Sequence, residues 1–397
     1  MWWRRYKPAF VTFSPPPVQE RGRSEEEVRS LLQEAKRRDL SYASGRILSS
    51  MCTSPLKVAS RAFCDFLETN LGDPGLFPGT RELEERAVKA IASLLGFAGA
   101  KGFIVSGGTE ANITALFAAR EAAKRSRPEV LVPETAHFSF EKAARMLGLR
   151  LIKAKVGEDS TVLVSDVERK ITPSTVAVVG IAGNTEYGAV DDIAALSELA
   201  LEHGLYLHVD AAFGGFVLPF LKELGFPAGE FDFSLRGVCS ITVDPHKMGL
   251  APVPAGCILF RDAGYLELLQ VESPYLTQPR QCTLLGTRSG ASAAAVFAAL
   301  TFLGKEGYRR VVERCMQVTL HLREGLLSLG MRVHEPWMNI LVFDHPQREA
   351  LAGELRARGW AISRTRRGEI RLVIMPHVKK EHAEQFLRDV EEAAEVL

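Results

Sequence analysis

One lysine stands where a nucleophile is more expected than a surface charge. Lys247 lies in "ITVDPHKMGLAP", directly after His246 and just beyond an apolar run that predicts a strand over 238–243. Burial disfavours the charged form of an amine, so we expect a lowered pKa here, and a neutral amine is a nucleophile. The competing interpretation is an ordinary lysine whose apolar stem is buried while its charge reaches solvent.

A second segment has the features of an anion site. In "FIVSGGTEANITAL" a predicted strand ends, Gly107 and Gly108 follow, and a helix begins at Thr109. Glycines let backbone N–H groups approach a ligand closely, and a helix N-terminus favours an anion. The spacing is neither GxGxxG nor a Walker loop, so dinucleotide and P-loop sites lose support. A tight strand–helix turn without a ligand is the alternative.

A carboxylate ends another predicted strand. In "LYLHVDAAFGG", Asp210 comes at the C-terminal end of the strand and small residues follow it. Ligands of open α/β sheets bind at this end of the strands, and the alanines leave room for a flat, charged heterocycle. The alternative is a structural aspartate that caps the next segment. His137, in "ETAHFSFEKAA", would by itself be interpreted as a structural histidine, and it becomes a candidate site residue only together with the other three segments.

Together these segments match the requirements of pyridoxal 5′-phosphate (PLP). A lysine forms an imine with this cofactor, an aspartate keeps its pyridine nitrogen protonated, and a glycine-rich helix start holds its phosphate. Imine formation would also remove the cost of burying the Lys247 charge. The sequence therefore predicts a PLP site, and it contains no zinc-ligand spacing that would predict a metal.

The same motifs resemble a known family. In this order and spacing, "SGGTEAN", "HFSFEKA", "HVDAAFGG" and "DPHKMG" resemble the fold-type I, group II PLP-dependent amino acid decarboxylases. The similarity is greatest to the archaeal L-tyrosine/L-aspartate decarboxylases, which "GDPGLFPGT", "LGTRSG" and "RLVIMPHV" also fit, and it runs from about Asp39 to the C-terminus. It implies the PLP-dependent transferase fold, an α/β fold with a seven-stranded, mainly parallel sheet, helices on both faces and a small C-terminal α+β domain.

The resemblance implies roles around the cofactor for residues at matching positions. Lys247 would carry the cofactor, Asp210 would pair with its pyridine nitrogen, and Ala212 would lie against its ring. His137 would stack on the other face of the ring, and Thr185 would lie near the 3′-oxygen. The cofactor-binding set is completed by the phosphate loop and by the histidine before the lysine, namely Gly107, Gly108, Thr109 and His246.

It also implies residues that act on the substrate. Arg371 would grip the α-carboxylate of the amino acid, and the alternative is that it is a surface residue of its strand. Tyr275, in "SPYLT", would belong to a mobile loop and reprotonate the carbanion. His137 and His246 are the next candidates for this catalytic proton transfer.

A further motif implies a second subunit. "LGTRSG" would complete the phosphate site of the neighbouring chain through Thr287 or Ser289, so we expect a homodimer with composite active sites. Two positions depart from the family pattern. Asp244 stands where many relatives carry Asn or Ser, and an ionised carboxylate cannot donate to a phosphate. Asn184 stands where relatives often have threonine.

The reaction that the resemblance implies is α-decarboxylation of a small L-amino acid. L-Aspartate would give β-alanine for coenzyme A, and L-tyrosine would give tyramine for methanofuran. L-Glutamate is an alternative substrate, and a PLP-dependent lyase or sulfur-transfer enzyme is an alternative activity on the same fold. The intact lysine, aspartate and histidine set argues against a binding protein without catalysis.

The composition limits the class of protein. The 397 residues carry a net charge of +1 and 46% of them are hydrophobic, so nothing favours a nucleic-acid or membrane partner. The six cysteines show no CxxC pairing, which predicts reduced thiols in a cytoplasmic protein. We also see no secretory signal.

The elements that must position these residues alternate along the chain. Apolar runs predict strands at 102–105, 130–132, 149–154, 176–182, 205–210, 238–243 and 256–260. Helices are predicted between most of them, including 109–126, 138–147 and 191–203, which favours a largely parallel sheet. We predict an irregular leader over 1–23, an N-terminal helical segment over 24–75, a large PLP-binding domain over 76–310 and a small domain over 311–397.

Overall fold

The computed structural model describes residue 18 and residues 20–397, and the chain divides into two units, Met1–Ser41 and Tyr42–Leu397. Most of the predicted leader over 1–23 therefore lies outside the described residues. The first unit contains helix α1 (Glu25–Lys36). Ser24 and Glu27 cap each other at its start, because each side chain accepts a hydrogen bond from the other's backbone N–H.

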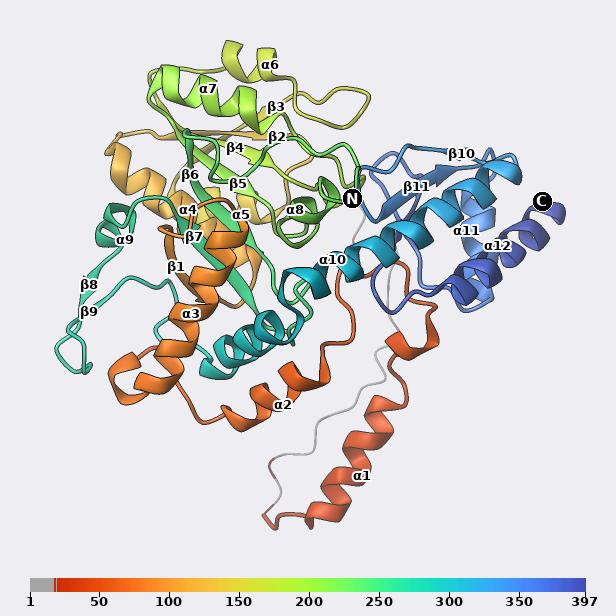
Figure 1. Cartoon of the computed structure of the whole chain (residues 1–397), viewed down its shortest axis with the longest axis horizontal. Helices are drawn as coiled ribbons and strands as arrows, with labels where there is room; N and C mark the ends of the chain where they lie inside the picture. Colours follow the sequence, from red (N-terminus) through yellow and green to blue (C-terminus); the bar gives the residue numbers. More distant parts are fainter. Residues whose placement is uncertain (1–17, 19) are drawn as a thin grey trace. The chain divides into compact units, whose positions relative to one another are not determined.

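A seven-stranded sheet forms the centre of the second unit (Figure 1). Its strands are β1 (Lys101–Val105), β2 (Glu129–Pro133), β3 (Arg150–Ala154), β4 (Thr175–Ile181), β5 (Tyr206–Asp210), β6 (Val238–Val243) and β7 (Gly256–Phe260). Their order is β1-β7-β6-β5-β4-β2-β3, with β7 antiparallel to both neighbours and every other pairing parallel. The predicted seven-stranded, mainly parallel sheet is confirmed, and the carboxyl ends of six strands meet at one edge.

Helices cover both faces of this sheet. Alternate residues of a strand point to opposite sides, and Val178 of β4 packs in a different cluster from its neighbours Ala177 and Val179. Because both faces are buried, β2, β4, β5 and β7 contain only buried residues and lack polar alternation. The helices of this region are α2 (Lys57–Asp65), α3 (Pro78–Leu94), α4 (Gly108–Ala123), α5 (Ser139–Leu147), α6 (Val164–Arg169), α7 (Ile193–His203), α8 (Leu218–Leu221) and α9 (Gly264–Leu268).

A smaller sheet follows the long helix α10 (Gly290–Ser328), which is kinked at Gly304. Its strands pair antiparallel in the order β10-β11-β13-β12, and residues of α10, α11 and α12 complete its core. The elements after α10 are β10 (Arg332–Val333), β11 (Ile340–Asp344), α11 (Arg348–Ala357), β12 (Ser363–Arg364), β13 (Ile370–Val373) and α12 (Lys380–Glu395). The small C-terminal α+β region is confirmed, whereas the predicted boundary at residue 311 falls inside α10 and stays a prediction.

A buried ion pair joins three segments beside the glycine-rich turn. Arg288 donates to the Glu84 carboxylate of α3 and, at 2.9 Å, to the backbone carbonyl of Ile104 in β1. Glu84 also accepts from the Ile104 backbone N–H at 2.9 Å. Removing one partner of such a buried pair costs about 3–5 kcal/mol, so this contact holds the start of α10 to the strand that leads into Gly107.

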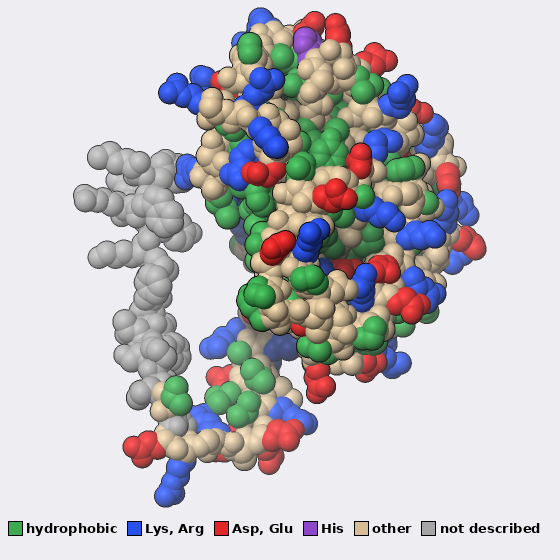
Figure 2. All heavy atoms as spheres, turned by 90° about the vertical axis from the view of Figure 1, so that its left-hand side faces the viewer, with side chains coloured by type: hydrophobic (Ala, Val, Ile, Leu, Met, Phe, Trp, Pro, Cys, Tyr) green, Lys and Arg blue, Asp and Glu red, His purple; other side chains and the backbone are tan. Residues whose placement is uncertain are grey.

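The helices and the charged side chains of the surface bear on possible partners. Among the described residues, no helix combines the length and the apolarity that a membrane crossing needs. Figure 2 shows basic and acidic side chains interspersed over the face that it draws, which agrees with a net charge of +1. A short hairpin of β8 (Val271–Glu272) and β9 (Arg280–Gln281) carries Tyr275 in its loop.

Candidate active site

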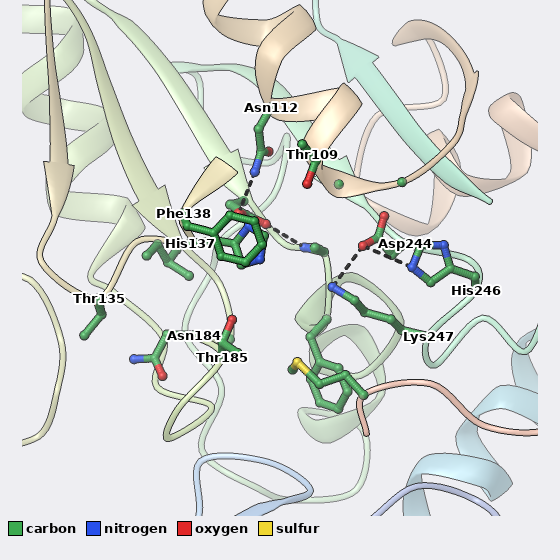
Figure 3. A pocket seen from close by; sticks show the side chains of 18 of the residues that line it. Thr109, Asn112, Thr135, His137, Phe138, Asn184, Thr185, Asp244, His246 and Lys247 are labelled. Carbon is green, nitrogen blue, oxygen red and sulfur yellow. Dashed lines mark hydrogen bonds and ion pairs between the residues drawn. The ribbon is translucent and has the colours of Figure 1, made fainter. Parts of the chain in front are cut away.

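A cavity of about 390 Å³ is lined by segments that follow the strands at the carboxyl edge of the large sheet. It gathers nine of the residues singled out from the sequence: Gly107, Gly108, Thr109, His137, Thr185, Asp210, Ala212, His246 and Lys247. Figure 3 shows Lys247 and His246 on one side of this cavity and His137 and Thr185 on the other. Segments far apart in the sequence meet here because the carboxyl ends of the strands converge.

Lys247 is held by a carboxylate three residues before it. β6 ends at Val243, and the following turn places Lys247 Nζ 2.9 Å from Asp244 Oδ2, with His246 Nε2 3.6 Å from the same oxygen. Burial by itself lowers the pKa of Lys247, but the carboxylates of Asp244 and Asp210 raise it above its ordinary value. The lowered pKa predicted from the sequence is therefore wrong for this chain without its ligand, and Asp244 acts as the counter-ion of the lysine.

Asp210 is fixed by a chain of hydrogen bonds through Asn112 and His208, neither of which was predicted as a site residue. Its Oδ2 accepts from Asn112 Nδ2 at 2.9 Å, and its Oδ1 accepts from the Ala212 backbone N–H at 3.1 Å. Asn112 Oδ1 lies 3.0 Å from His208 Nε2, and His208 Nδ1 lies 2.7 Å from Ser240 Oγ. One signal was available, because His208 precedes Asp210 by two residues and so shares its face of β5.

The direction of this chain follows from the carboxylate. An ionised Asp210 only accepts hydrogen bonds, so Asn112 turns its amide N–H₂ toward it and its carbonyl oxygen toward His208. His208 then donates a hydrogen bond from Nε2–H to Asn112 Oδ1, and its Nδ1 accepts a hydrogen bond from the Ser240 hydroxyl. Burial lowers the pKa of His208 to about 3, so the ring stays neutral and preserves this arrangement.

Two histidines in the cavity wall have a lowered pKa, which favours their neutral form. Burial lowers the pKa of His137, whose Nδ1 accepts from the Ser139 backbone N–H at 3.3 Å and whose ring centroid lies 4.0 Å from that of Phe138. Burial also lowers the pKa of His246, whose Nδ1 accepts from the Ala255 backbone N–H at 3.2 Å. No group of three or more His, Cys, Asp or Glu among the described residues is placed to hold a metal ion.

The glycine-rich turn packs so closely against neighbouring groups that side chains there would crowd them. A Cβ atom at Gly108 would lie 3.0 Å from Asp244 Oδ2, and one at Gly107 would lie 3.1 Å from His246 Cε1. Gly256, which pairs with the end of β1, would place a Cβ atom only 2.5 Å from the Cα atom of Gly107. The turn opens onto the N-terminus of the 16-residue helix α4, so close backbone approach and the helix dipole both suit a phosphate.

Arg371 lies beside the cavity rather than in its wall. It is 5% exposed in β13, and its Nη1 donates to the Ser49 carbonyl at 3.2 Å and to Ser363 Oγ at 3.0 Å. Nε and Nη2 have no hydrogen-bond partner among the described residues, which is unusual for buried donors. Burial lowers the pKa of Arg371 to about 10, so it remains a cation. The alternative that Arg371 is a surface residue is therefore wrong. Its partner Ser49 lies two residues before Met51, which lines the cavity.

Three other predicted residues lie outside the cavity of their own chain. Tyr275 is 86% exposed in the β8–β9 loop, and Thr287 is exposed as well. Ser289 caps α10 by accepting a hydrogen bond from the Ser292 backbone N–H at 3.2 Å. The roles of Tyr275, Thr287 and Ser289 need a second subunit or a loop movement, and they stay predictions.

Comparison with known proteins points to one family. Residues 51–334 match the family model described as "Pyridoxal-dependent decarboxylase conserved domain". The chain is 54% identical to a "Probable L-tyrosine/L-aspartate decarboxylase" of Methanothermobacter thermautotrophicus, over 89% of this chain and 98% of that protein. It is 51% identical to an "L-aspartate decarboxylase" of Thermococcus kodakarensis, over 95% and 99% of the two chains. A solved sphingosine-1-phosphate lyase of Burkholderia pseudomallei matches with a TM-score of 0.89 at 29% identity, over 96% of this chain and 92% of the other.

The neutral state of His208 makes folding stability depend on pH. An unfolded histidine titrates near pH 6.5, whereas folded His208 has a pKa of about 3. Between these values the unfolded chain binds more protons, so this contribution is complete above about pH 6.5 and is lost as the pH falls toward 3. We expect His208 to remove about 2 kcal/mol of unfolding free energy between pH 7.5 and pH 5, as measured by denaturant unfolding.

The variant His208→Gln isolates this contribution because glutamine does not titrate. Its loss of unfolding free energy between the two pH values should be smaller than that of the wild type by about 2 kcal/mol. Equal losses in both proteins would show that His208 is protonated without penalty and that the neutral chain through Asn112 is not what stabilises Asp210.

Proposed function

Because this chain belongs to the pyridoxal-dependent decarboxylase family, and is a PLP-dependent amino acid decarboxylase, we propose that its substrate is L-aspartate, with L-tyrosine as a second substrate. Two relatives that are about half identical to it share L-aspartate in their names, and one of the names also contains L-tyrosine. These names carry the choice of substrate, and the cavity that gathers Lys247, Asp210 and His137 beside the glycine-rich turn carries the reaction.

The residues of the cavity fit the cofactor. The backbone N–H groups of the Gly107–Gly108 turn, at the N-terminus of α4, would hold the phosphate. Lys247 would attach the cofactor covalently, and Asp210, already oriented by Asn112, would pair with the pyridine nitrogen. When bound, PLP supplies an electron-withdrawing ring that takes up the electrons left at Cα as CO₂ departs.

The other side chains would shield and support this site. The neutral His137 ring would cover one face of the cofactor and exclude water, with Ala212 on the opposite face and Thr185 near the 3′-oxygen. Asp244 would hold the Lys247 ammonium group whenever the lysine is released from its covalent bond. His246 accepts a hydrogen bond from the Ala255 backbone N–H and would thereby keep the turn before the lysine in place.

Two residues would act on the substrate itself. Nε and Nη2 of Arg371 are buried donors without partners, and a substrate carboxylate could satisfy both through a bidentate contact. That contact would fix the direction of the bond that breaks. Tyr275 would then deliver the proton to Cα from a loop that closes over the cavity.

A lyase or sulfur-transfer activity on the same fold is the main alternative. The solved lyase shares the fold at 29% identity, whereas the relatives named decarboxylases are 54% and 51% identical to this chain. Since fold does not define the reaction, the higher identity favours decarboxylation. L-Glutamate remains the alternative substrate.

The proposed products indicate a cellular setting. β-Alanine from L-aspartate would supply coenzyme A, and tyramine from L-tyrosine would supply methanofuran. All six cysteines are free thiols, which suits a reducing compartment, so we place the enzyme in the cytoplasm.

We further propose a homodimer in which each subunit completes the active site of its partner. Tyr275 and Thr287 are exposed and lie outside the cavity of their own chain, although the family resemblance assigns them to the site. Helix α1 also exposes Val28, Leu31 and Leu32, which share one face because they are three and four residues apart. An exposed apolar stripe of this kind suits a subunit interface.

Release of CO₂ from single amino acids tests the proposed function. PLP-loaded protein is given L-aspartate, L-glutamate or L-tyrosine at equal concentration, and CO₂ and amine are measured. We expect kcat/KM for L-aspartate to exceed that for L-glutamate about tenfold, the lower end of what one extra methylene is worth, because a site that also admits L-tyrosine is not closed around aspartate. Lys247→Ala is the control and should release only background CO₂. No CO₂ from any of the three would contradict the reaction, and a preference for L-glutamate would contradict the substrate.

Subunit mixing tests the composite site. Lys247→Ala and Tyr275→Phe chains are unfolded together and refolded, so that about half of the dimers contain one chain of each kind. If Tyr275 acts on the partner's site, one of the two sites in a mixed dimer has both native residues, and amine formation should return to roughly a quarter of the wild-type rate. If Tyr275 acts within its own chain, the mixture will show only the average of the two separate variants.

A further inference from the structure

A turn of the small domain touches two loops that line the active cavity. This 365–369 turn joins β12 to β13 and is closed by a hydrogen bond from Thr365 N–H to the Glu369 carbonyl at 3.0 Å. Gly368 allows the reversal because it takes a φ of +86°, where other residues are strained. Glu369 directly precedes β13, which carries Arg371. The position of the turn and the position of the Arg371 guanidinium are therefore linked through a few backbone bonds.

The first contact is made by the Glu369 carboxylate, which collects three hydrogen bonds. The Tyr187 hydroxyl donates to Oε2 at 2.5 Å, and the Thr365 hydroxyl donates to the same oxygen at 3.0 Å. His334 Nε2 lies 2.7 Å from Oε1. Tyr187, Thr365 and Glu369 are all buried, so water does not compete for these bonds. Burial would raise the pKa of Glu369, but the donors lower it, which keeps the acceptor charged and the bonds strong.

Tyr187 connects this contact to the cavity. It belongs to the loop after β4, and its backbone N–H donates to Asn184 Oδ1 at 2.8 Å. Asn184 and its neighbour Thr185 line the cavity. Asn184 Nδ2 also donates to the Ser160 carbonyl at 3.1 Å, so the loop itself is well fixed. The Tyr187 hydroxyl is thus a rigid point of attachment on the cofactor side.

The second contact is made by Arg366. Its backbone N–H donates to Glu186 Oε2 at 2.7 Å, and its Nε lies 3.0 Å from Glu186 Oε1. Its Nη1 also donates to the backbone carbonyl of Glu134, which precedes Thr135 of the cavity wall. The 365–369 turn is therefore bonded both to the loop that holds Thr185 and to the loop that leads to His137.

We propose that the 365–369 turn is a latch, and that Tyr187 and Glu369 are positioning residues that fix Arg371 relative to the cofactor-binding loops. The inference rests on the proposed function, because it assumes that Arg371 captures the substrate carboxylate. An undocked turn would displace the guanidinium, so only molecules with a docked turn would bind substrate well. The apparent affinity then falls in proportion to the docked fraction, while bound substrate itself selects the docked form.

The variant Tyr187→Phe removes the bond and keeps the ring. We expect KM for the amino acid substrate to rise by the factor by which the docked fraction falls, at most about tenfold for the loss of one hydrogen bond to a charged acceptor, with kcat changed less than about threefold. Hydrogen exchange in the protein without substrate should become faster in peptides that cover 183–188 and 363–371. If the two residues act through one bond, the double variant Tyr187→Phe/Glu369→Ala should have the same KM as Glu369→Ala alone.

The control is Tyr206→Phe, which removes another buried tyrosine hydroxyl, at the opposite end of β5 from Asp210. Its KM and its exchange in the two peptides should stay within about twofold of the wild type. Unchanged exchange in Tyr187→Phe would show that no latch exists. Faster exchange with an unchanged KM would show that the latch does not position Arg371. Should the wild type decarboxylate none of the amino acids tested, the proposed function fails, and hydrogen exchange still decides whether the turn is latched by Tyr187.

Discussion

A lysine ammonium group paired with a carboxylate is the interaction on which this site depends. Lys247 is a poor residue to bury, and Asp244, 2.9 Å from its Nζ, offsets the cost of removing it from water. That arrangement requires β5 and β6 side by side, because Asp210 pairs with Thr242 one residue before the end of β6. It also favours glycine at 108, since a Cβ atom there would lie 3.0 Å from the Asp244 carboxylate and would crowd it. The end of β5, the end of β6 and the glycine-rich turn thus all lie beside this charged pair.

The Asp210 carboxylate determines the donor and acceptor roles along a chain of hydrogen bonds. Asp210 orients Asn112, Asn112 fixes the tautomer of His208, and His208 accepts from Ser240 on the neighbouring strand. Every member is buried, so each donor and acceptor must be matched or the site loses stability. The neutral His208, with a pKa lowered to about 3, therefore has a structural role in the core. Through Asn112 it holds the Asp210 carboxylate in one orientation at the cavity.

Much of this could be predicted from the sequence, for a physical reason. Strands buried on both faces are continuous apolar runs, and Gly107, Asp210 and Lys247 each follow one of them, so their convergence at one edge is a consequence of parallel pairing. The sign of the Lys247 pKa shift could not be predicted, because it depends on a turn that folds Asp244 back onto the amine. The contacts of Tyr187 with Glu369 were also hidden, since they join segments 182 residues apart with no periodic signal.

If the lysine held by Asp244 carries the cofactor, borohydride reduction should fix the cofactor to that lysine permanently. The protein is loaded with PLP, reduced with borohydride without substrate, digested and mapped by mass spectrometry. We expect one pyridoxyl group per chain, on Lys247 in the "DPHKMG" peptide, and none in Lys247→Ala. Label on any other lysine, or a Lys247 peptide labelled no more than those of exposed lysines, would contradict it.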